Sequence, residues 1–220
     1  MKKIIGYHFV NDALRDGTKI PKDGVWLEHT GQIKMCSSGL HGSLSAFDAL
    51  QYAPGNTLCL VEFGGEIIEG HDKLVARARK IIARFEADEL LFKFARDCAL
   101  SVVHFWDAPE VVLNYLKTGD KKLKAATRIK AYSAACREAS SAACRAACRA
   151  ASSAACIASS SAACRAASSA ACRADLSLHK KRVRLLFDAC VDAEFYHLGY
   201  DVPKMRKEIS QQDESGQEEP

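Results

Sequence analysis

The sequence predicts an α+β protein, in which a small sheet-based N-terminal domain is followed by a mainly α-helical, alanine-rich repeat region. Two observations carry this prediction. Short β-rich runs fill residues 1–86, whereas from Ala87 onward apolar residues recur at the spacings of three and four that are typical of a helix. In addition, the segment from Ser133 to Ala174 consists almost entirely of Ala, Ser, Cys and Arg.

Residues 1–86 are expected to form the sheet-based head domain. Residues 57–63 are apolar nearly throughout, which indicates a central strand. A hairpin is expected at 25–36, around a Thr-Gly pair. A short helix is expected at 44–53, with Ser43 or Ser45 as its cap. The strands expected outside the hairpin are 4–10, 57–63, 66–68, 73–76 and 80–85.

Residues 87–119 are expected to form two helices that pack on the head domain. The apolar spacing of the first helix runs to about residue 106. Asp107 is expected to cap the second helix, with Pro109 in its first turn. Gly119 is expected to end this second helix.

Residues 120–198 are expected to form a helical repeat region that closes with an amphipathic helix. Neither Gly nor Pro occurs between Gly119 and Gly199, so no residue in this stretch is a strong helix breaker. The expected apolar anchors of the closing helix are Leu178, Val183, Leu186, Phe187, Cys190, Ala193 and Tyr196. The polar residues 199–220 are expected to be a disordered tail.

The alanine-rich segment repeats every four residues. Four residues advance an α-helix by about 400°, so the alanine stripe drifts roughly 40° with each repeat. Such a spiral faces successive neighbours rather than one straight partner, which predicts self-association or binding of a partner. The cysteines spiral in the same way and give no cluster of metal ligands, so we expect no metal and no cofactor. Because no export signal is evident, we expect them to be reduced thiols. These cysteines are Cys136, Cys144, Cys148, Cys156, Cys164 and Cys172.

A net charge of +4 is too small to indicate nucleic acid by itself. The arginines of the repeat are open to two interpretations, a phosphate-binding stripe or charges that keep an alanine-rich helix in solution. We favour the second, because no aromatic residues are interleaved to stack on bases. Neither a signal peptide nor a long apolar run is evident, so we expect no membrane span and a location in the cytoplasm of a host cell.

Candidate site residues lie in the head domain. Gly39, His41 and Ser43 stand at an expected strand-to-helix junction, where backbone amides can hold an anion and His41 can titrate near neutral pH. The candidate ligand-binding residues are Gly39, His41 and Ser43, and the candidate catalytic residues are His41, His8 and Glu62. Their spacing fits no zinc signature. The competing interpretation is that these residues are structural.

The chain resembles an uncharacterised domain found in phages and prophages in four places: the run from Cys36 to Ser43, the run from Asp48 to Gly55, the strand through Val61-Glu62, and the following Gly65-Glu66-Ile67-Ile68. The resemblance covers about residues 1–120, and many members of that group carry long alanine-rich repeat tails. It implies a viral or prophage accessory protein without an assigned catalytic residue.

The turn at Gly39–Ser43, the helix after it and the strong strand that follows also resemble the middle of an ADP-ribosyltransferase fold. This resemblance implies that His8 and His41 lie in a nicotinamide pocket. Glu62 and Glu66 come earlier in the chain than the glutamate of that fold.

The sequence therefore predicts a non-enzymatic, phage-type accessory protein whose repeat region mediates self-association or partner binding. The alternatives are an ADP-ribosyltransferase-like head, a head that binds or sequesters a nucleotide, and a basic helical nucleic-acid binder.

Overall fold

The computed structural model describes residues 2–14, 17–101, 103, 108–127, 129–130 and 177–215. The chain divides into two compact units. The head unit combines Met1–Ala87 with Leu186–Pro220, and the helical unit is Asp88–Leu185. A five-stranded antiparallel sheet together with helices confirms the predicted α+β class. The predicted repeat at 133–174 lies outside the described residues.

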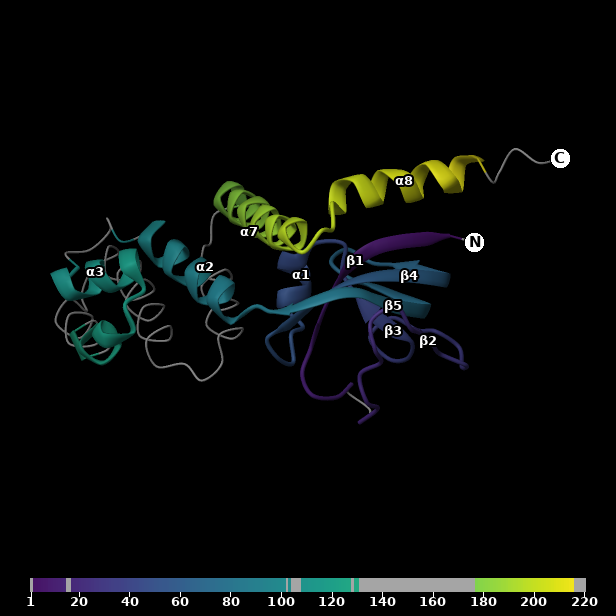
Figure 1. Cartoon of the computed structure of the whole chain (residues 1–220), viewed down its shortest axis with the longest axis horizontal. Coiled ribbons are helices and arrows are strands. Elements are labelled where there is room, and N and C mark those ends of the chain that lie inside the picture. The colour runs from purple at the N-terminus through teal and green to yellow at the C-terminus, as the bar shows by residue number, and fades with distance from the viewer. Residues whose placement is uncertain are drawn as a thin grey trace. The chain divides into compact units, whose positions relative to one another are not determined.

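The sheet of the head unit is built around one long hairpin. Its strands are β1 (Lys3–Val10), β2 (Trp26–Glu28), β3 (Leu40–Gly42), β4 (Thr57–Glu69) and β5 (Leu74–Glu86). The order is β1-β4-β5-β2, and β3 also pairs with β5. Figure 1 shows β1, β4 and β5 side by side. The predicted opening strand and the predicted central strand are therefore confirmed.

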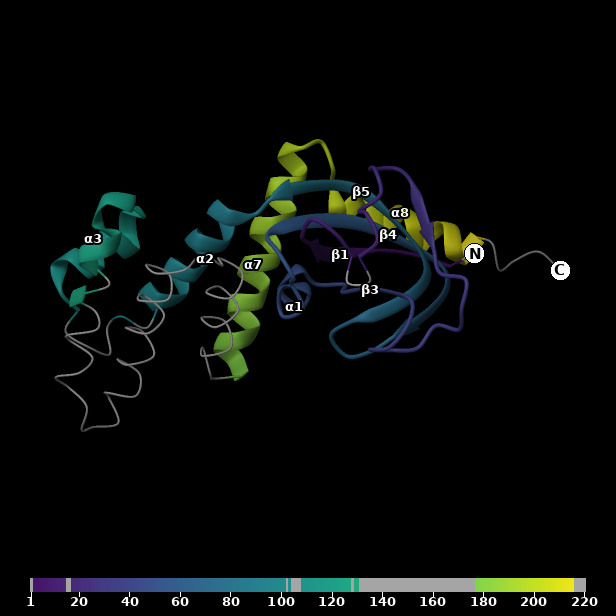
Figure 2. The same ribbon diagram turned by 90° about the horizontal axis from the view of Figure 1, so that it is seen from below.

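The short strands predicted after residue 63 are parts of β4 and β5, each of which is 13 residues long. The pairing register of these two strands shifts between Leu60 and Val61 and again between Gly64 and Ile67. Gly65, inside the second shift, has a left-handed φ of 78°. A bulge interrupts the two-residue alternation by which a strand is recognised, so one strand reads as several. Figure 2 shows β4 and β5 curving together.

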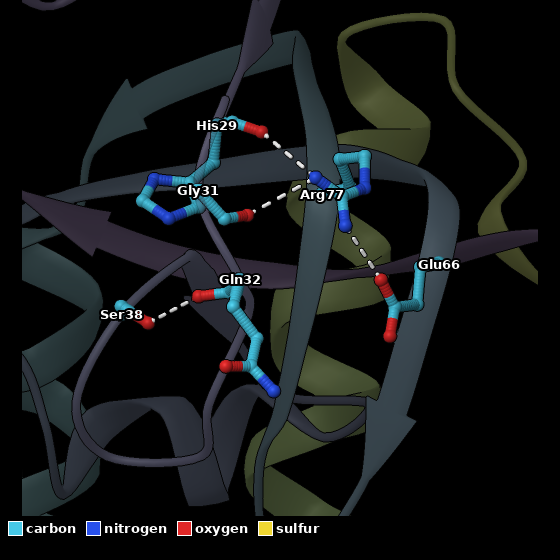
Figure 3. Close-up of polar contacts among 6 residues, drawn as sticks. All are labelled: His29, Gly31, Gln32, Ser38, Glu66 and Arg77. Atoms are coloured by element: carbon cyan, nitrogen blue, oxygen red, sulfur yellow. Dashed lines mark hydrogen bonds and ion pairs between the residues drawn. The ribbon is translucent and has the colours of Figure 1, made fainter.

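The hairpin predicted at 25–36 is wrong. Strand β2 pairs with β5 instead, and residues 34–38 form a tight turn. Arg77 of β5 fixes the loop between them: its Nη1 donates to the Gly31 carbonyl at 3.0 Å, and its Nη2 pairs with Glu66 at 2.7 Å (Figure 3). Gly31 and Arg77 are 46 residues apart in the chain, so no local turn signal reports this pairing.

Helix α1 (Ala46–Leu50) follows β3, and the Ser45 hydroxyl caps it by accepting from the Asp48 amide. Helix α7 (Ser177–His197) confirms the predicted closing helix. Its buried residues recur every four positions, at Phe187, Val191 and Phe195, and they face the head unit. The predicted anchors Leu186, Cys190, Ala193 and Tyr196 are exposed, so most of the predicted apolar face is wrong.

The segment predicted to be a disordered tail contains helix α8 (Val202–Ser215). The Asp201 carboxylate caps α8 by accepting from the Lys204 amide at 3.0 Å. Val202 is fully buried, and Arg206 donates to the Leu44 carbonyl at 2.7 Å. These contacts hold a polar segment on the head unit. The composition of the segment alone does not indicate that it is ordered. Figure 1 shows α8 beside β1, in agreement with the contacts between them.

The helical unit contains α2 (Asp88–Ser101), α3 (Glu110–Thr118) and a 3₁₀ turn, η2 (Lys121–Leu123). Helices α2 and α3 contact each other. Pro109 is the N-cap of α3 rather than a first-turn residue, and the predicted cap Asp107 lies outside the described residues. Gly119 ends α3 in the left-handed conformation, as predicted. In the described ranges, no helix is long and apolar enough to cross a membrane.

Candidate functional site

The register of the sheet separates the polar residues of the head unit onto two faces. Tyr7 stands opposite Leu60, and its ring contacts Phe195 of α7. His8 stands opposite Cys59, so its side chain points to the other face. Arg79 stands opposite Phe63, which alternation along β4 places on the same face as Cys59. We call this face, which carries His8, Cys59 and Arg79, the inner face.

His41 is held by two hydrogen bonds within its own loop. The Cys36 amide donates to Nε2 at 3.0 Å, and Nδ1 is 3.1 Å from the Gly39 carbonyl. Since a backbone carbonyl only accepts, Nδ1 carries the proton and donates to it. Both ring nitrogens are thus used to shape the turn before β3. The geometry gives the predicted catalytic candidate His41 a structural role.

Glu62 lies on the face opposite His8, so the structure does not bring these two candidates together. Its carboxylate pairs with Lys3 at 2.8 Å and with Lys80 at 2.6 Å. Burial alone would raise the pKa of Glu62, but the hydrogen bonds from Lys3 and Lys80 outweigh it and lower the pKa below 4.5. Glu62 is therefore an ionised anchor for two strands rather than a general acid.

The charge on Glu62 is expected to stabilise the head unit in a pH-dependent way. Because folding lowers its pKa, the contribution is complete above the ordinary value of 4.5 and is lost as the pH falls through the folded-state pKa. At pH 7 the variant Glu62→Gln should lose about 1 kcal/mol of unfolding free energy, since both lysines are partly exposed. Urea titrations at a series of pH values measure this difference.

Glu66→Gln is the control for this experiment, because the Glu66 carboxylate pairs with Arg77 at an exposed position. At neutral pH, Glu66→Gln should lower the free energy of unfolding by less than Glu62→Gln does. A deficit of Glu62→Gln that persisted unchanged at pH 3 would contradict the assignment.

Gly39 and Ser43 both help to fix the backbone conformation around strand β3. Gly39 has a left-handed φ of 104°, and a Cβ there would lie 2.6 Å from a methyl group of Val75. Ser43 forms a two-way backbone bridge with Tyr7, at 2.8 and 3.0 Å. Its hydroxyl is buried and, among the described residues, is the one buried side-chain oxygen or nitrogen without a hydrogen-bond partner. Gly39 is thus a conformational requirement, whereas the Ser43 hydroxyl is unexplained by the fold.

Arg79 is a buried charged residue of the inner face that the sequence did not single out. Its side chain is only 5% exposed, and Nη1 donates to the His41 carbonyl at 2.5 Å. Burial lowers the pKa of Arg79 to about 10, so the group is still a cation at neutral pH. Strand β5 also carries Arg77, Lys80 and Arg84, and composition alone does not tell which of the four is buried.

His8 completes the inner-face group. The residue is partly buried, and burial together with the nearby Arg79 guanidinium and His41 lowers its pKa well below the usual range. The imidazole is therefore neutral at neutral pH. Its neighbour Cys59 is a buried thiol whose pKa burial raises to about 12, which makes it a poor nucleophile.

The inner face thus places a buried guanidinium and a neutral imidazole beside an apolar core cluster that includes Cys59, Val61 and Phe63. Within the described ranges, no three His, Cys, Asp or Glu side chains are grouped as a metal site requires.

Comparison with known proteins places a family model on the sheet. Residues 4–93 match the model of a domain of unknown function (DUF7666), which spans β1 to the first turns of α2. This agrees with the expected resemblance to an uncharacterised domain. No curated protein and no solved structure matches the chain.

Proposed function

We propose that this protein is a non-enzymatic accessory protein of phage type, in which the helical region that ends in α7 mediates self-association. The roles of the polar residues support the non-enzymatic part, because His41 shapes a turn and Glu62 neutralises two lysines on the opposite face from His8. The phage assignment is supported by the resemblance of residues 36–68 described above.

One observation carries the proposal of self-association, an exposed apolar stripe on α7. At 100° per residue its five members fall within one arc of roughly 120°. They are Leu186, Ala189, Cys190, Ala193 and Tyr196, all of them exposed. Leu186 is 57% exposed and Tyr196 65%, whereas Phe187 and Phe195 on the other side of the helix are buried in the head unit. An uncharged stripe of this kind marks an interaction surface.

A second copy of the chain fits this stripe. Leu186 and Tyr196 stand at its two ends, with Ala189 and Ala193 between them. In a two-fold antiparallel pair, Leu186 of one copy meets Tyr196 of the other, while the alanines let the helices approach closely. The stripe is only about 15 Å long. The repeat that precedes α7 in the chain has the same small residues, and we propose that it extends the contact.

Light scattering coupled to size-exclusion chromatography tests this proposal. The full chain is expected to be a dimer or larger, and Leu186→Glu with Tyr196→Glu should shift it to the monomer, because the charges would be buried at the contact. Gln211→Glu, at an exposed position of α8, is the matched control and should leave the mass unchanged. A wild-type monomer at every concentration, or a double variant that associates like the wild type, would count against the proposal.

Two other functions have less support. An ADP-ribosyl-transferring head needs a carboxylate near the two histidines, but Glu62 is on the opposite face and Glu66 pairs with Arg77. Nucleic-acid binding would rest on the arginines of the repeat, which lie outside the described residues.

A further inference from the structure

The head unit is assembled from two pieces of chain that are far apart in the sequence. Residues 1–87 supply the sheet and α1, and residues 186–220 supply the end of α7 and all of α8, with 98 residues between the two pieces. The family match ends at residue 93, so α7 and α8 lie outside the matched residues. The helices that cover the sheet therefore reach it from a distant part of the chain.

The first piece offers three buried aromatic rings to the helix that covers it. Phe47 of α1 meets Phe187 edge to face, with ring centroids 6.2 Å apart, and Phe85 of β5 meets Phe195 in the same way at 5.1 Å. The ring of Tyr7 is 6.2 Å from that of Phe195. Both rings of α7 are fully buried. The first piece thus forms an apolar site for one amphipathic helix.

Three hydrogen-bond donors of the first piece require carboxylates at fixed places on that helix. The Ser45 hydroxyl and the Phe47 amide donate to the Asp188 carboxylate, at 2.7 and 2.8 Å. One turn later, the Asp192 carboxylate accepts from the Tyr7 hydroxyl. All three donors belong to buried residues, and a buried donor without an acceptor is costly. The site therefore recognises a helix that carries two aspartates four positions apart beside its apolar side.

The named contacts all run between side chains or backbone groups of the two pieces, and none uses the residues that join them. The α7 of a second copy would make the same contacts. We propose that two copies of the chain exchange residues 186–220, so that each sheet is covered by α7 and α8 of the other copy. The closed and exchanged forms share these contacts and differ mainly in chain entropy and effective concentration. High protein concentration during folding therefore favours the exchanged dimer.

This exchange uses the buried side of α7, so it does not rest on the exposed stripe. The double variant Leu186→Glu with Tyr196→Glu alters two exposed positions and keeps the buried rings and both aspartates. A dimer of this variant therefore cannot come from the stripe. Because α7 must leave the sheet before it can exchange, chains that fold at low concentration stay closed and monomeric. The two modes of association can thus fail or succeed independently.

The test refolds an equal mixture of two isotope-labelled populations of the double variant from urea, at low and at high protein concentration. Both populations are deuterated; one keeps protons only in its phenylalanine rings and the other only in its tyrosine rings. A nuclear Overhauser effect between Phe195 and Tyr7 then requires the two rings to belong to different copies. The dimer isolated by size-exclusion chromatography after refolding at high concentration should show this signal, and the monomer from the same mixture should not.

A further substitution in this background tests which contact controls the exchange. Asp188→Ala removes two hydrogen bonds to a charged acceptor, so α7 should leave the sheet more often and the dimer should form about a hundredfold faster from folded monomer. Asp23→Ala, which breaks an ion pair with Arg84, is the matched control and should not change the rate. Refolding that gives only monomer at every concentration would overturn the proposal, and so would a dimer without the signal between Phe195 and Tyr7.

Discussion

Replacing Phe195 with alanine is expected to lower the free energy of unfolding by about 3–5 kcal/mol. The ring of Phe195 is fully buried, with its centroid 5.1 Å from that of Phe85 and 6.2 Å from that of Tyr7. These partners belong to β5 and β1, so one side chain of α7 packs on two strands of the sheet. Its removal leaves a cavity that neighbouring strands cannot close without losing their own pairing.

Urea unfolding followed by circular dichroism measures the loss at Phe195. Glu194→Ala, at the adjacent exposed position, is the control and should change the stability by less than about 0.5 kcal/mol. A cost of Phe195→Ala below about 1 kcal/mol would show that α7 is not packed on the sheet in solution.

Replacing Asp188 with alanine is expected to cost about 3 kcal/mol. Its carboxylate accepts from the Ser45 hydroxyl at 2.7 Å and from the Phe47 amide at 2.8 Å, at the start of α1. Both donors belong to buried residues, so they would lose a charged acceptor without gaining water. One turn later, the neighbouring Asp192 accepts from the Tyr7 hydroxyl. The two carboxylates therefore attach α7 to α1 and to β1.

Hydrogen exchange separates this local effect from a general loss of stability. In Asp188→Ala the amide of Phe47 should exchange faster than the amides of β4, whose partners are unchanged. Asp23→Ala is the matched control, because Asp23 pairs with Arg84 at an exposed position and should cost less than about 1 kcal/mol. Equal stability losses in the two variants would contradict the role given to Asp188.

Local sequence patterns predict those elements of the fold that depend on residues close together in the chain. The apolar run of β4, the serine cap of α1 and the glycine that ends α3 are confirmed. The partner of β2 is not predictable in this way, because its pairing with β5 joins distant parts of the chain. Helix α8 was missed for a related reason, since Val202 and Arg206 hold it on residues near the N-terminus.

In the candidate site, too, the sequence predicts some features and misses those that depend on distant parts of the chain. The sequence singled out His8, His41 and Ser43 by residue type, and the last two also by their place at a junction. In the structure Ser43 stands opposite Tyr7 and shares its face, whereas His8 points to the other face. Their roles depend on what each atom faces, which residue type does not reveal. Arg79 was missed because β5 carries four basic residues, and the sequence does not tell that Arg79 is buried while the other three lie at partly exposed positions beside carboxylates. The bulges in β4 and β5 also hide the pairing register from any count along the sequence.

The head unit is made of two pieces of chain, residues 1–87 and 186–220, with 98 residues between them. A ribosome adds about 5–20 residues per second, so roughly 5–20 s separate the synthesis of β5 from that of the residues of α7 that cover it. During this interval Tyr7 and Phe85 are without Phe195, the aromatic partner that buries them. The nascent sheet thus passes through a stage with an uncovered apolar face, at which chaperone binding or premature association competes with folding. A stop codon placed before residue 186 would make that stage permanent.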